Sequence, residues 1–227
     1  MAAITQSRRV KSAKQAAPIT CLFLDIGDVL LTDGWDHHAR GRAAAAFKLD
    51  LAEINERHRL TFETFEDGKL TLEQYLSLVV FYRRRPFTRA QFQRFIFAQS
   101  KACPGMIDML AHLKLRHSLK VIALSNEARE LNAHRIRKFR LNALMDVFVS
   151  SCYVQIRKPD EAIFKLALDI AQTPIRQILY IDNTPMFVQI AESLGIQSIL
   201  HTGIESTRAK LALLGLRNDE GGNHAIR

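Results

Sequence analysis

Residues 20–31 read TCLFLDIGDVLL, in which an apolar run ends at a carboxylate and a glycine. The run Thr20–Ile26 is rich in branched and aromatic side chains, a composition typical of a buried strand. Asp25 and Gly27 stand where such a strand leaves its sheet. Ligands of open parallel sheets bind beyond the carboxyl ends of the strands. The stretch therefore predicts a central strand whose end carries a functional carboxylate.

Further segments of the same kind lie toward the C-terminus. The other expected strands are Leu119–Ser125, Val147–Ser151, Ile178–Asp182 and Gln197–His201. Helical periodicity covers 104–117, 128–141, 160–172, 185–194 and 205–215. Strands that alternate with helices predict an α/β fold, a doubly wound parallel sheet with helices on both faces.

The interval between the first two strands is roughly 85 residues, far more than one crossover needs. Helical patterns fall near 39–48, 51–59, 72–83 and 88–99. The third pattern begins with a capping box in which Thr71 precedes Gln74 by three residues. We therefore expect an inserted helical subdomain, or cap, over 34–102.

The division of the chain follows from these patterns. The core domain is expected over 18–33 and 103–217, with a disordered basic tail over 1–17 and a polar tail over 218–227. The formal net charge is +9, but the first tail contributes four basic residues and no acid. The remaining basic runs lie on segments with helical spacing, so they indicate solvated helix faces and no nucleic-acid partner.

The composition excludes two classes of protein. The longest apolar runs are far shorter than the ~20 residues that cross a bilayer, so no membrane association is expected. The three cysteines form no CxxC pair, which argues against a disulfide framework or a thiolate zinc site. A cytoplasmic location is the expectation, because reducing compartments suit free cysteines.

Polar residues also follow the other expected strands. Ser125 and Asn126 end the second, Asp182 and Asn183 end the fourth, and Lys158 follows the third. Because the carboxyl ends of parallel strands share one edge of the sheet, these residues are expected to converge there with Asp25. Grouped carboxylates need a cation or a metal ion beside them.

Four of these segments, FLDIGDVLL, ALSN, RKPD and YIDN, resemble in this order the motifs of the haloacid dehalogenase-like (HAD) hydrolase superfamily. The resemblance covers residues 18–216, and the helical insertion lies where the family places a cap over the active site. It looks closest to capped phosphatases whose first motif is DxG. The resemblance implies a HAD-like Rossmannoid core and a Mg²⁺-dependent phosphatase of a small phosphorylated metabolite, acting through an aspartyl-phosphate intermediate.

The resemblance also implies roles for individual residues. Asp25 is the expected nucleophile, and the catalytic set includes Ser125, Lys158 and Asp182. Ser125, Asn126 and Lys158 are expected to bind the phosphoryl oxygens. The implied Mg²⁺ ligands are one oxygen of Asp25, the backbone carbonyl of Gly27, and the side chains of Asp182 and Asn183.

Two positions depart from the family pattern. Asn183 stands where a carboxylate usually ligates Mg²⁺ directly, and an uncharged amide oxygen should weaken that site. Gly27 stands where many members carry the aspartate that protonates the leaving group. Substrates with good leaving groups are therefore favoured, and Asp28, His37 or His38 are candidates to replace the missing acid.

Substrate choice is expected to depend on the helical insertion, where Trp35, His37, His38, Arg40 and Phe65 are candidate contacts. Two alternatives remain open. One is a metal-independent dehalogenase acting on 2-haloacids, for which Asn183 and Gly27 are both suitable. The other is a non-catalytic HAD domain that binds a ligand or a protein partner. The residues leave the oligomeric state undetermined.

Overall fold

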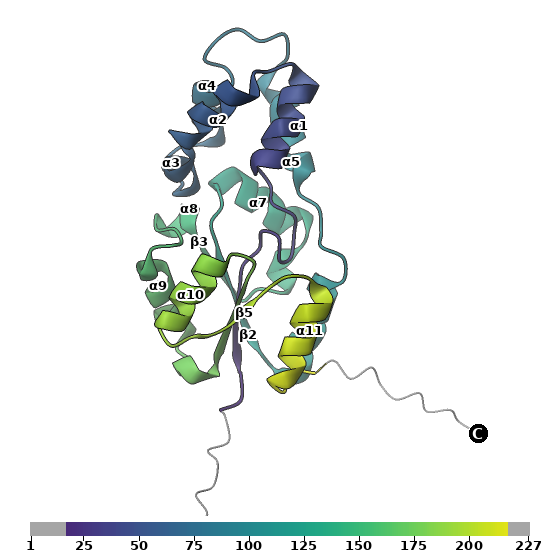
Figure 1. The fold of residues 1–227 in the computed structure, drawn as a ribbon, viewed down its shortest axis with the longest axis vertical. Helices are drawn as coiled ribbons and strands as arrows, with labels where there is room; N and C mark the ends of the chain where they lie inside the picture. The colour runs from purple at the N-terminus through teal and green to yellow at the C-terminus, as the bar shows by residue number, and fades with distance from the viewer. Residues whose placement is uncertain (1–16, 218–227) are drawn as a thin grey trace, which may run out of the picture.

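The computed structural model describes residues 17–217 and contains a parallel five-stranded sheet in the order β3-β2-β1-β4-β5 (Figure 1). The strands are β1 (Cys21–Leu24), β2 (Lys120–Ser125), β3 (Val147–Ser150), β4 (Ile178–Asp182) and β5 (Gln197–Leu200). All five predicted strands and the α/β fold class are confirmed, although some strands are shorter at their ends. The predicted tails fall, apart from residue 17, outside the described residues.

Helices cover both faces of the sheet. Leu22 and Leu24 of β1 pack with α6 (Met106–His117) and α11 (Ile204–Leu213). Cys21 and Phe23 of β1 pack with α9 (Glu161–Ala171) and α10 (Pro185–Ser193). Figure 1 shows α9 and α10 on one side of the strands and α11 on the other. Successive residues of a strand point to opposite faces, so the apolar run of β1 requires cover on both.

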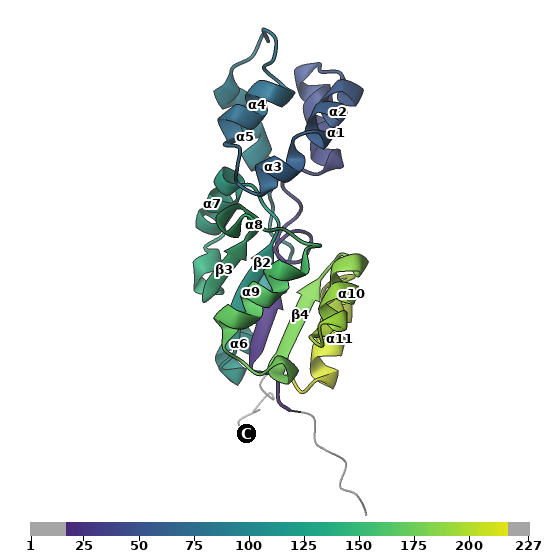
Figure 2. The ribbon, with the colours of Figure 1, turned by 90° about the vertical axis from the view of Figure 1, so that its left-hand side faces the viewer.

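Five helices follow β1 and lie together beyond the carboxyl ends of the strands, the upper part of Figures 1 and 2. They are α1 (His37–Phe47), α2 (Leu51–Arg59), α3 (Phe62–Glu66), α4 (Leu72–Val79) and α5 (Arg89–Gln99). Buried side chains such as Ile54, Tyr75 and Phe92 form a core of their own. Ala128 and Leu131, at the start of α7 (Arg129–Lys138), join that core. The helical segment therefore packs on the sheet domain through α7.

The structure corrects several helix limits in this segment. The short helix α3 was not predicted, because five residues carry too little periodicity. The helix predicted to reach residue 83 ends at Val79, and Arg85 Nε donates to the carbonyl of Val80, the residue that follows it, at 2.8 Å. The capping box of Thr71 and Gln74 is confirmed.

The remaining limits differ by small amounts. The helix predicted over 128–141 ends at Lys138, and a short 3₁₀ turn, η1 (Leu141–Ala143), follows it. The short helix α8 (Ser151–Val154) follows β3, and a second 3₁₀ turn, η2 (Ile175–Gln177), precedes β4. Within residues 17–217, no helix is both long and apolar enough to cross a bilayer.

Candidate active site

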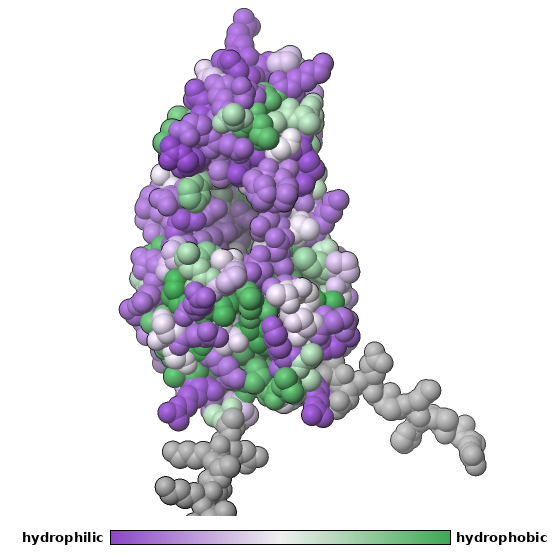
Figure 3. Space-filling model, viewed as in Figure 1, coloured by the Kyte–Doolittle hydropathy of each residue, from purple (hydrophilic) through white to green (hydrophobic). Residues whose placement is uncertain are grey.

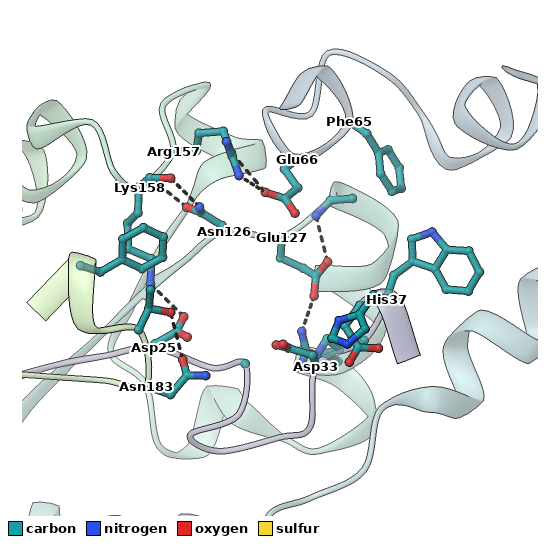
Figure 4. A pocket seen from close by; sticks show the side chains of 18 of the residues that line it. Asp25, Asp33, His37, Phe65, Glu66, Asn126, Glu127, Arg157, Lys158 and Asn183 are labelled. Atoms are coloured by element: carbon teal, nitrogen blue, oxygen red, sulfur yellow. Dashed lines mark hydrogen bonds and ion pairs between the residues drawn. The ribbon is translucent and has the colours of Figure 1, made fainter. Parts of the chain in front are cut away.

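A cavity of about 380 Å³ lies between the carboxyl edge of the sheet and the helical segment. Asp25, Lys158 and Asn183 line it from the sheet, and Arg40 and Phe65 line it from the helical segment. The space-filling view is hollowed at this level, with hydrophilic residues around the opening (Figure 3). Figure 4 shows Asp25, Lys158 and Asn183 together on one side of this pocket. The predicted convergence at the sheet edge is therefore present.

Lys158 lies between two carboxylates beneath the cavity. Its Nζ is 3.1 Å from Asp25 Oδ1 and 2.6 Å from Asp182 Oδ2. The lysine side chain is 1% exposed and that of Asp182 is fully buried. Burial opposes the charge on Lys158, but the two carboxylates raise the pKa of its ammonium above the ordinary value. Lys158 therefore remains a cation directed at Asp25.

The surroundings of Asp25 shift its pKa in opposite directions. Burial raises its pKa to about 6, Lys158 opposes that rise, and the negative charge of Asp182 adds to it. At neutral pH the carboxylate is therefore mostly ionised. An ionised carboxylate that faces a cavity and lies beside a lysine ammonium is suited to attack an electrophile.

Asp182 lies behind Lys158 and does not line the cavity. Tyr180 donates its hydroxyl to Asp182 Oδ2, the oxygen that also pairs with Lys158. The backbone N–H of Thr184 donates to Asp182 Oδ1 at 2.7 Å. Both oxygens of Asp182 are thus engaged within the protein. Asp182 also pairs with Lys158, and its role as a Mg²⁺ ligand stays a prediction.

Asn126 and Ser125 are placed differently from each other. The Asn126 side chain lines the cavity and forms two hydrogen bonds with the backbone of Lys158, donating to its carbonyl at 2.8 Å and accepting from its N–H at 2.9 Å. These bonds fix the loop that carries the lysine. Ser125 is the last residue of β2 and is buried at 1% exposure, so its hydroxyl lies behind the cavity surface.

Three of the predicted oxygen donors for a metal ion, Asp25, Gly27 and Asn183, line the cavity. Mg²⁺ prefers hard oxygen ligands and binds through few protein groups, with phosphate and water completing its shell. A carboxylate oxygen, a backbone carbonyl and an amide oxygen fit that requirement. Their single full negative charge is consistent with weak affinity for the free ion.

A second carboxylate, Asp33, faces the same cavity beside Gly27. A Cβ atom built on Gly27 would lie closer than 3.0 Å to Asp33 Oδ1, so glycine is required at position 27 while Asp33 keeps this place. Burial, with the charges of Asp28 and Asp25, raises the pKa of Asp33 to about 7. Asp28 itself lines a neighbouring cavity of about 400 Å³.

Two ion pairs enclose the other side of the cavity. Glu127 pairs with Arg135, and Glu66 accepts from Arg157 Nη2 at 2.8 Å. Burial raises the pKa of both glutamates, and their arginines oppose the rise. Figure 4 shows the Arg157–Glu66 pair across the pocket from Asp25. Each glutamate is therefore paired with an arginine, and both pairs form part of the cavity wall.

Four of the five predicted specificity residues line the cavity, namely Trp35, His37, Arg40 and Phe65. Trp35 Nε1 donates to the Tyr75 hydroxyl at 2.7 Å, and Phe65 stacks on the Tyr75 ring with centroids 4.1 Å apart. These aromatic rings form an apolar wall. The fifth residue, His38, is exposed and lines the neighbouring cavity instead, so its prediction as a contact in the main cavity is corrected.

Comparison with known proteins matches residues 19–203 to a family described as haloacid dehalogenase-like hydrolases. The chain belongs to the haloacid dehalogenase-like hydrolase family. The resemblance indicated by the four strand-end motifs is thereby confirmed, and with it the assignment to a family of hydrolases.

Solved HAD structures share the fold. A HAD family enzyme from Bacteroides thetaiotaomicron matches 82% of this chain and 95% of its own with a TM-score of 0.70 and 19% identity. Another structure of that enzyme is a complex with magnesium and inorganic phosphate. A dehalogenase matches 79% of this chain and 83% of its own with a TM-score of 0.58 and 19% identity. At these identities the likeness shows that this chain shares their fold.

A curated relative of the HAD chain is the drimenol cyclase drtB of Aspergillus calidoustus, which is 27% identical over 210 residues. The match covers 89% of this chain and 38% of the cyclase. The chain therefore spans well under half the length of this relative.

The sequence motifs of the HAD family did not indicate every residue at the site. Asp33, Glu127, Arg135 and Tyr180 were not predicted. The only local signal was the alternation of Tyr180 with Asp182 on one strand, which places both side chains on the same face. For Asp33, the glycine at position 27 was the available hint, since a missing side chain leaves space for a neighbour.

Proposed function

We propose that this HAD protein is a Mg²⁺-dependent phosphatase that transfers the phosphoryl group of a small metabolite to Asp25. The observation that carries the proposal is the Asp25 carboxylate, which lines the cavity, 3.1 Å from the ammonium of Lys158 and beside the oxygen donors Gly27 and Asn183. Phosphoryl transfer depends chiefly on positioning and on stabilising charge on the oxygens, which this set supplies.

In the proposed reaction, an Asp25 oxygen attacks phosphorus while the bond to the leaving oxygen breaks. Lys158 and the Asn126 backbone N–H stabilise the equatorial oxygens. Ser125 does not line the cavity, so its proposed part is to support the loop that carries the Asn126 N–H. Water then hydrolyses the aspartyl phosphate and regenerates Asp25. A bound Mg²⁺ held by Asp25, Gly27 and Asn183 would neutralise charge on the phosphoryl group.

Asp182 contributes indirectly in this proposal. Its buried carboxylate, held by Tyr180 and Thr184, keeps Lys158 charged and pointed at Asp25. We therefore assign it a positioning role in place of direct coordination. A water molecule bridging Asp182 to the ion remains compatible with that role.

The helical segment over 34–102 is proposed to act as the cap of this site. It supplies Trp35, Arg40, His58 and Phe65 to the cavity opposite Asp25. Such an arrangement excludes bulk water when closed and selects the substrate by its leaving group. Arg40 lines this partly apolar pocket, and its Nε and Nη1 donate to Asn55 Oδ1 and to the Trp35 carbonyl. Its remaining N–H groups favour a metabolite with an anionic or hydroxyl group beyond the phosphate.

A second candidate function is dehalogenation of a 2-haloacid. Asn183 and the presence of Arg40 in the cavity favour it, because neither feature needs a metal and an arginine suits a carboxylate substrate. The same nucleophile, Asp25, would then attack carbon. Release of halide that continues in EDTA would decide for this function.

The test of the proposed phosphatase is Asp25→Asn, assayed by phosphate release from aryl and alkyl phosphates with Mg²⁺. Loss of the nucleophile is expected to lower kcat by about 10⁴-fold or more. The matched control is Asp108→Asn on the exposed face of α6, which should retain full activity.

The metal dependence is tested separately. EDTA is expected to abolish phosphate release and added Mg²⁺ to restore it. Turnover that is unchanged in EDTA would contradict the metal requirement, and turnover that survives Asp25→Asn would contradict the nucleophile. A wild-type protein that releases neither phosphate from any phosphate tested nor halide from 2-haloacids would favour the non-catalytic alternative.

A further inference from the structure

We propose that Asp33 protonates the leaving oxygen, taking the place of an acid that the chain lacks at position 27. The inference rests on the proposed phosphatase function and adds a catalytic residue to it. Asp33 and Asp25 both line the cavity, and each has a carboxylate oxygen within 4 Å of the point where a Cβ of residue 27 would lie. In an in-line displacement the leaving oxygen lies across phosphorus from the attacking Asp25 oxygen, so its proton must come from another group that faces the cavity.

The Asp33 carboxylate lies in the space that a side chain at position 27 would fill. A Cβ added to residue 27 would lie very close to Asp33 Oδ1. In an aspartate side chain, the Cβ and the carboxylate oxygens are separated by the same distance. Asp25 Oδ2 is 3.8 Å from the same point. The Asp33 oxygen thus lies within reach of where an aspartate at position 27 would hold its own. Residue 27 has no carboxylate of its own, and the carboxylate of Asp33, six residues later, lies in the space beside it.

The backbone around Asp33 is held firmly. Its N–H donates to Asp28 Oδ1 at 3.1 Å. The preceding residue, Thr32, accepts from Arg135 Nη2 at 2.6 Å through its carbonyl and donates its hydroxyl to the Gln99 carbonyl at 3.1 Å. The following residue, Gly34, has no room for a Cβ because the Leu131 side chain is 2.9 Å away from that point. The position of Asp33 is therefore set by the loop.

Most of the other proton donors in the cavity are engaged elsewhere, and His37, which also lines it, is exposed to solvent. Glu66 and Glu127 are each paired with an arginine, and Lys158 is shared between two carboxylates. His58 Nδ1 is 2.8 Å from the Tyr75 hydroxyl. Within residues 17–217, by contrast, the carboxylate of Asp33 has no hydrogen-bonding or ion-pairing partner. Asp33 is thus available for a proton transfer to substrate.

Protons balance over the two steps, the transfer of the phosphoryl group to Asp25 and the hydrolysis of the aspartyl phosphate. In the first, Asp25 forms a bond to phosphorus, the bond to the leaving oxygen breaks, and the Asp33 carboxylic acid gives its proton to that oxygen. In the second, water attacks the aspartyl phosphate, the Asp33 carboxylate accepts the proton from that water, and the bond to Asp25 breaks. Both residues return to their starting states, so no other reactant is needed.

The experiment measures kcat for Asp33→Asn on a series of aryl phosphates and on an alkyl phosphate. A general acid matters most for poor leaving groups, where it contributes about 10²–10⁴-fold. We expect a loss of that order for the alkyl phosphate and a loss of less than about 10-fold for 4-nitrophenyl phosphate. An equal loss across the series would overturn the inference.

A relocated acid provides the positive control. Gly27→Asp alone should be impaired, because the new side chain meets Asp33. The double variant Gly27→Asp with Asp33→Ala should recover turnover of the alkyl phosphate relative to Asp33→Asn. Failure to recover in a variant that melts like the wild type would count against the inference.

The two proposals fail in different ways. If the wild type releases phosphate and Asp33→Asn keeps the same dependence on the leaving group, only the role of Asp33 is wrong. If the wild type releases no phosphate from any member of the series, the proposed function is wrong and this inference falls with it.

Discussion

At the scale of single residues, the site is organised around one buried cation. Lys158 is almost fully buried, yet it stays charged because Asp25 and Asp182 lie within 3.1 Å of its ammonium. Removing one member of such a buried group is costly, since it leaves an uncompensated charge. The two carboxylates have different surroundings. Asp25 faces the cavity, and Asp182 is enclosed by Tyr180 and Thr184.

This difference predicts different effects for Asp182→Asn and Asn183→Ala. Asp182→Asn should lower the free energy of unfolding by about 3–5 kcal/mol, because Lys158 loses a buried partner. Asn183→Ala should barely change stability but raise the Mg²⁺ concentration for half-maximal activity by roughly 10–100-fold. Urea denaturation and a Mg²⁺ titration measure the two effects. A larger shift in Mg²⁺ requirement for Asp182→Asn would show that Asp182 is the direct ligand.

At the scale of elements, the turn after α3 docks the helical segment onto α8. Ser151 Oγ donates to the Glu66 carbonyl at 2.6 Å, and Arg157 pairs with Glu66 nearby. Gly68 has φ +69, and a Cβ there would lie within 3.0 Å of the Cys152 carbonyl oxygen. Glycine is therefore needed for both its backbone angle and the close approach. This contact closes the cavity on the side of Glu66.

The contact predicts that Gly68→Ala destabilises the protein by about 1–3 kcal/mol, as expected for overpacking together with an unfavourable backbone angle. The turn should also move away from α8, and kcat/KM should fall because Glu66 shifts with it. The matched control is Gly41→Ala in α1, where nothing lies near the new Cβ. That change should stabilise the helix by up to about 1 kcal/mol. Equal stability of the two variants would contradict the close contact.

At the scale of the whole molecule, two cores are joined into one structure. The core of the helical segment includes Ala128 and Leu131, and α7 continues from them onto the sheet domain. Thr32 and Arg135 add a bond of 2.6 Å between the loop after β1 and α7. We therefore expect both parts to unfold in one transition. A group buried in either part should then influence the stability of the whole.

His58 provides a pH test of that expectation. Burial, with the nearby charge of Arg40, lowers the pKa of His58 from 6.5 to about 4. The unfolded chain therefore binds a proton between pH 6.5 and 4 that the folded protein does not, so stability falls as the pH drops through that window. We expect His58 to account for about 2 kcal/mol of the loss.

Urea denaturation at pH 7 and pH 4.5 measures this effect in the wild type and in His58→Gln. The variant should show a smaller difference between the two pH values, and His112→Gln, an exposed change on α6, should behave like the wild type. An unchanged difference in His58→Gln would exclude this histidine as the cause. Two separate transitions would contradict the single unfolding unit.

The amino-acid sequence by itself determined the sheet, the helical insertion and the main site residues at its edge. Strands such as Cys21–Leu24 are short apolar runs between polar loops, and the carboxyl ends of parallel strands meet at one edge. Asp25, Lys158 and Asn183 were therefore predictable as neighbours. Asp25 and Asn183 directly follow their strands, whereas Lys158 follows β3 after α8 and a loop that Asn126 holds.

Only the tertiary structure decided the place of Asp33, the enclosure of Asp182, and the ion pairs of the cavity wall. Arg135 binds a carbonyl 103 residues away, and Arg157 pairs with Glu66 across 91 residues. Such contacts depend on how the helical segment packs against the sheet domain, which the periodicity of a single segment does not encode. The direction of a side chain at a strand end also depends on its neighbours, and Lys158 and Tyr180 turn Asp182 away from the cavity.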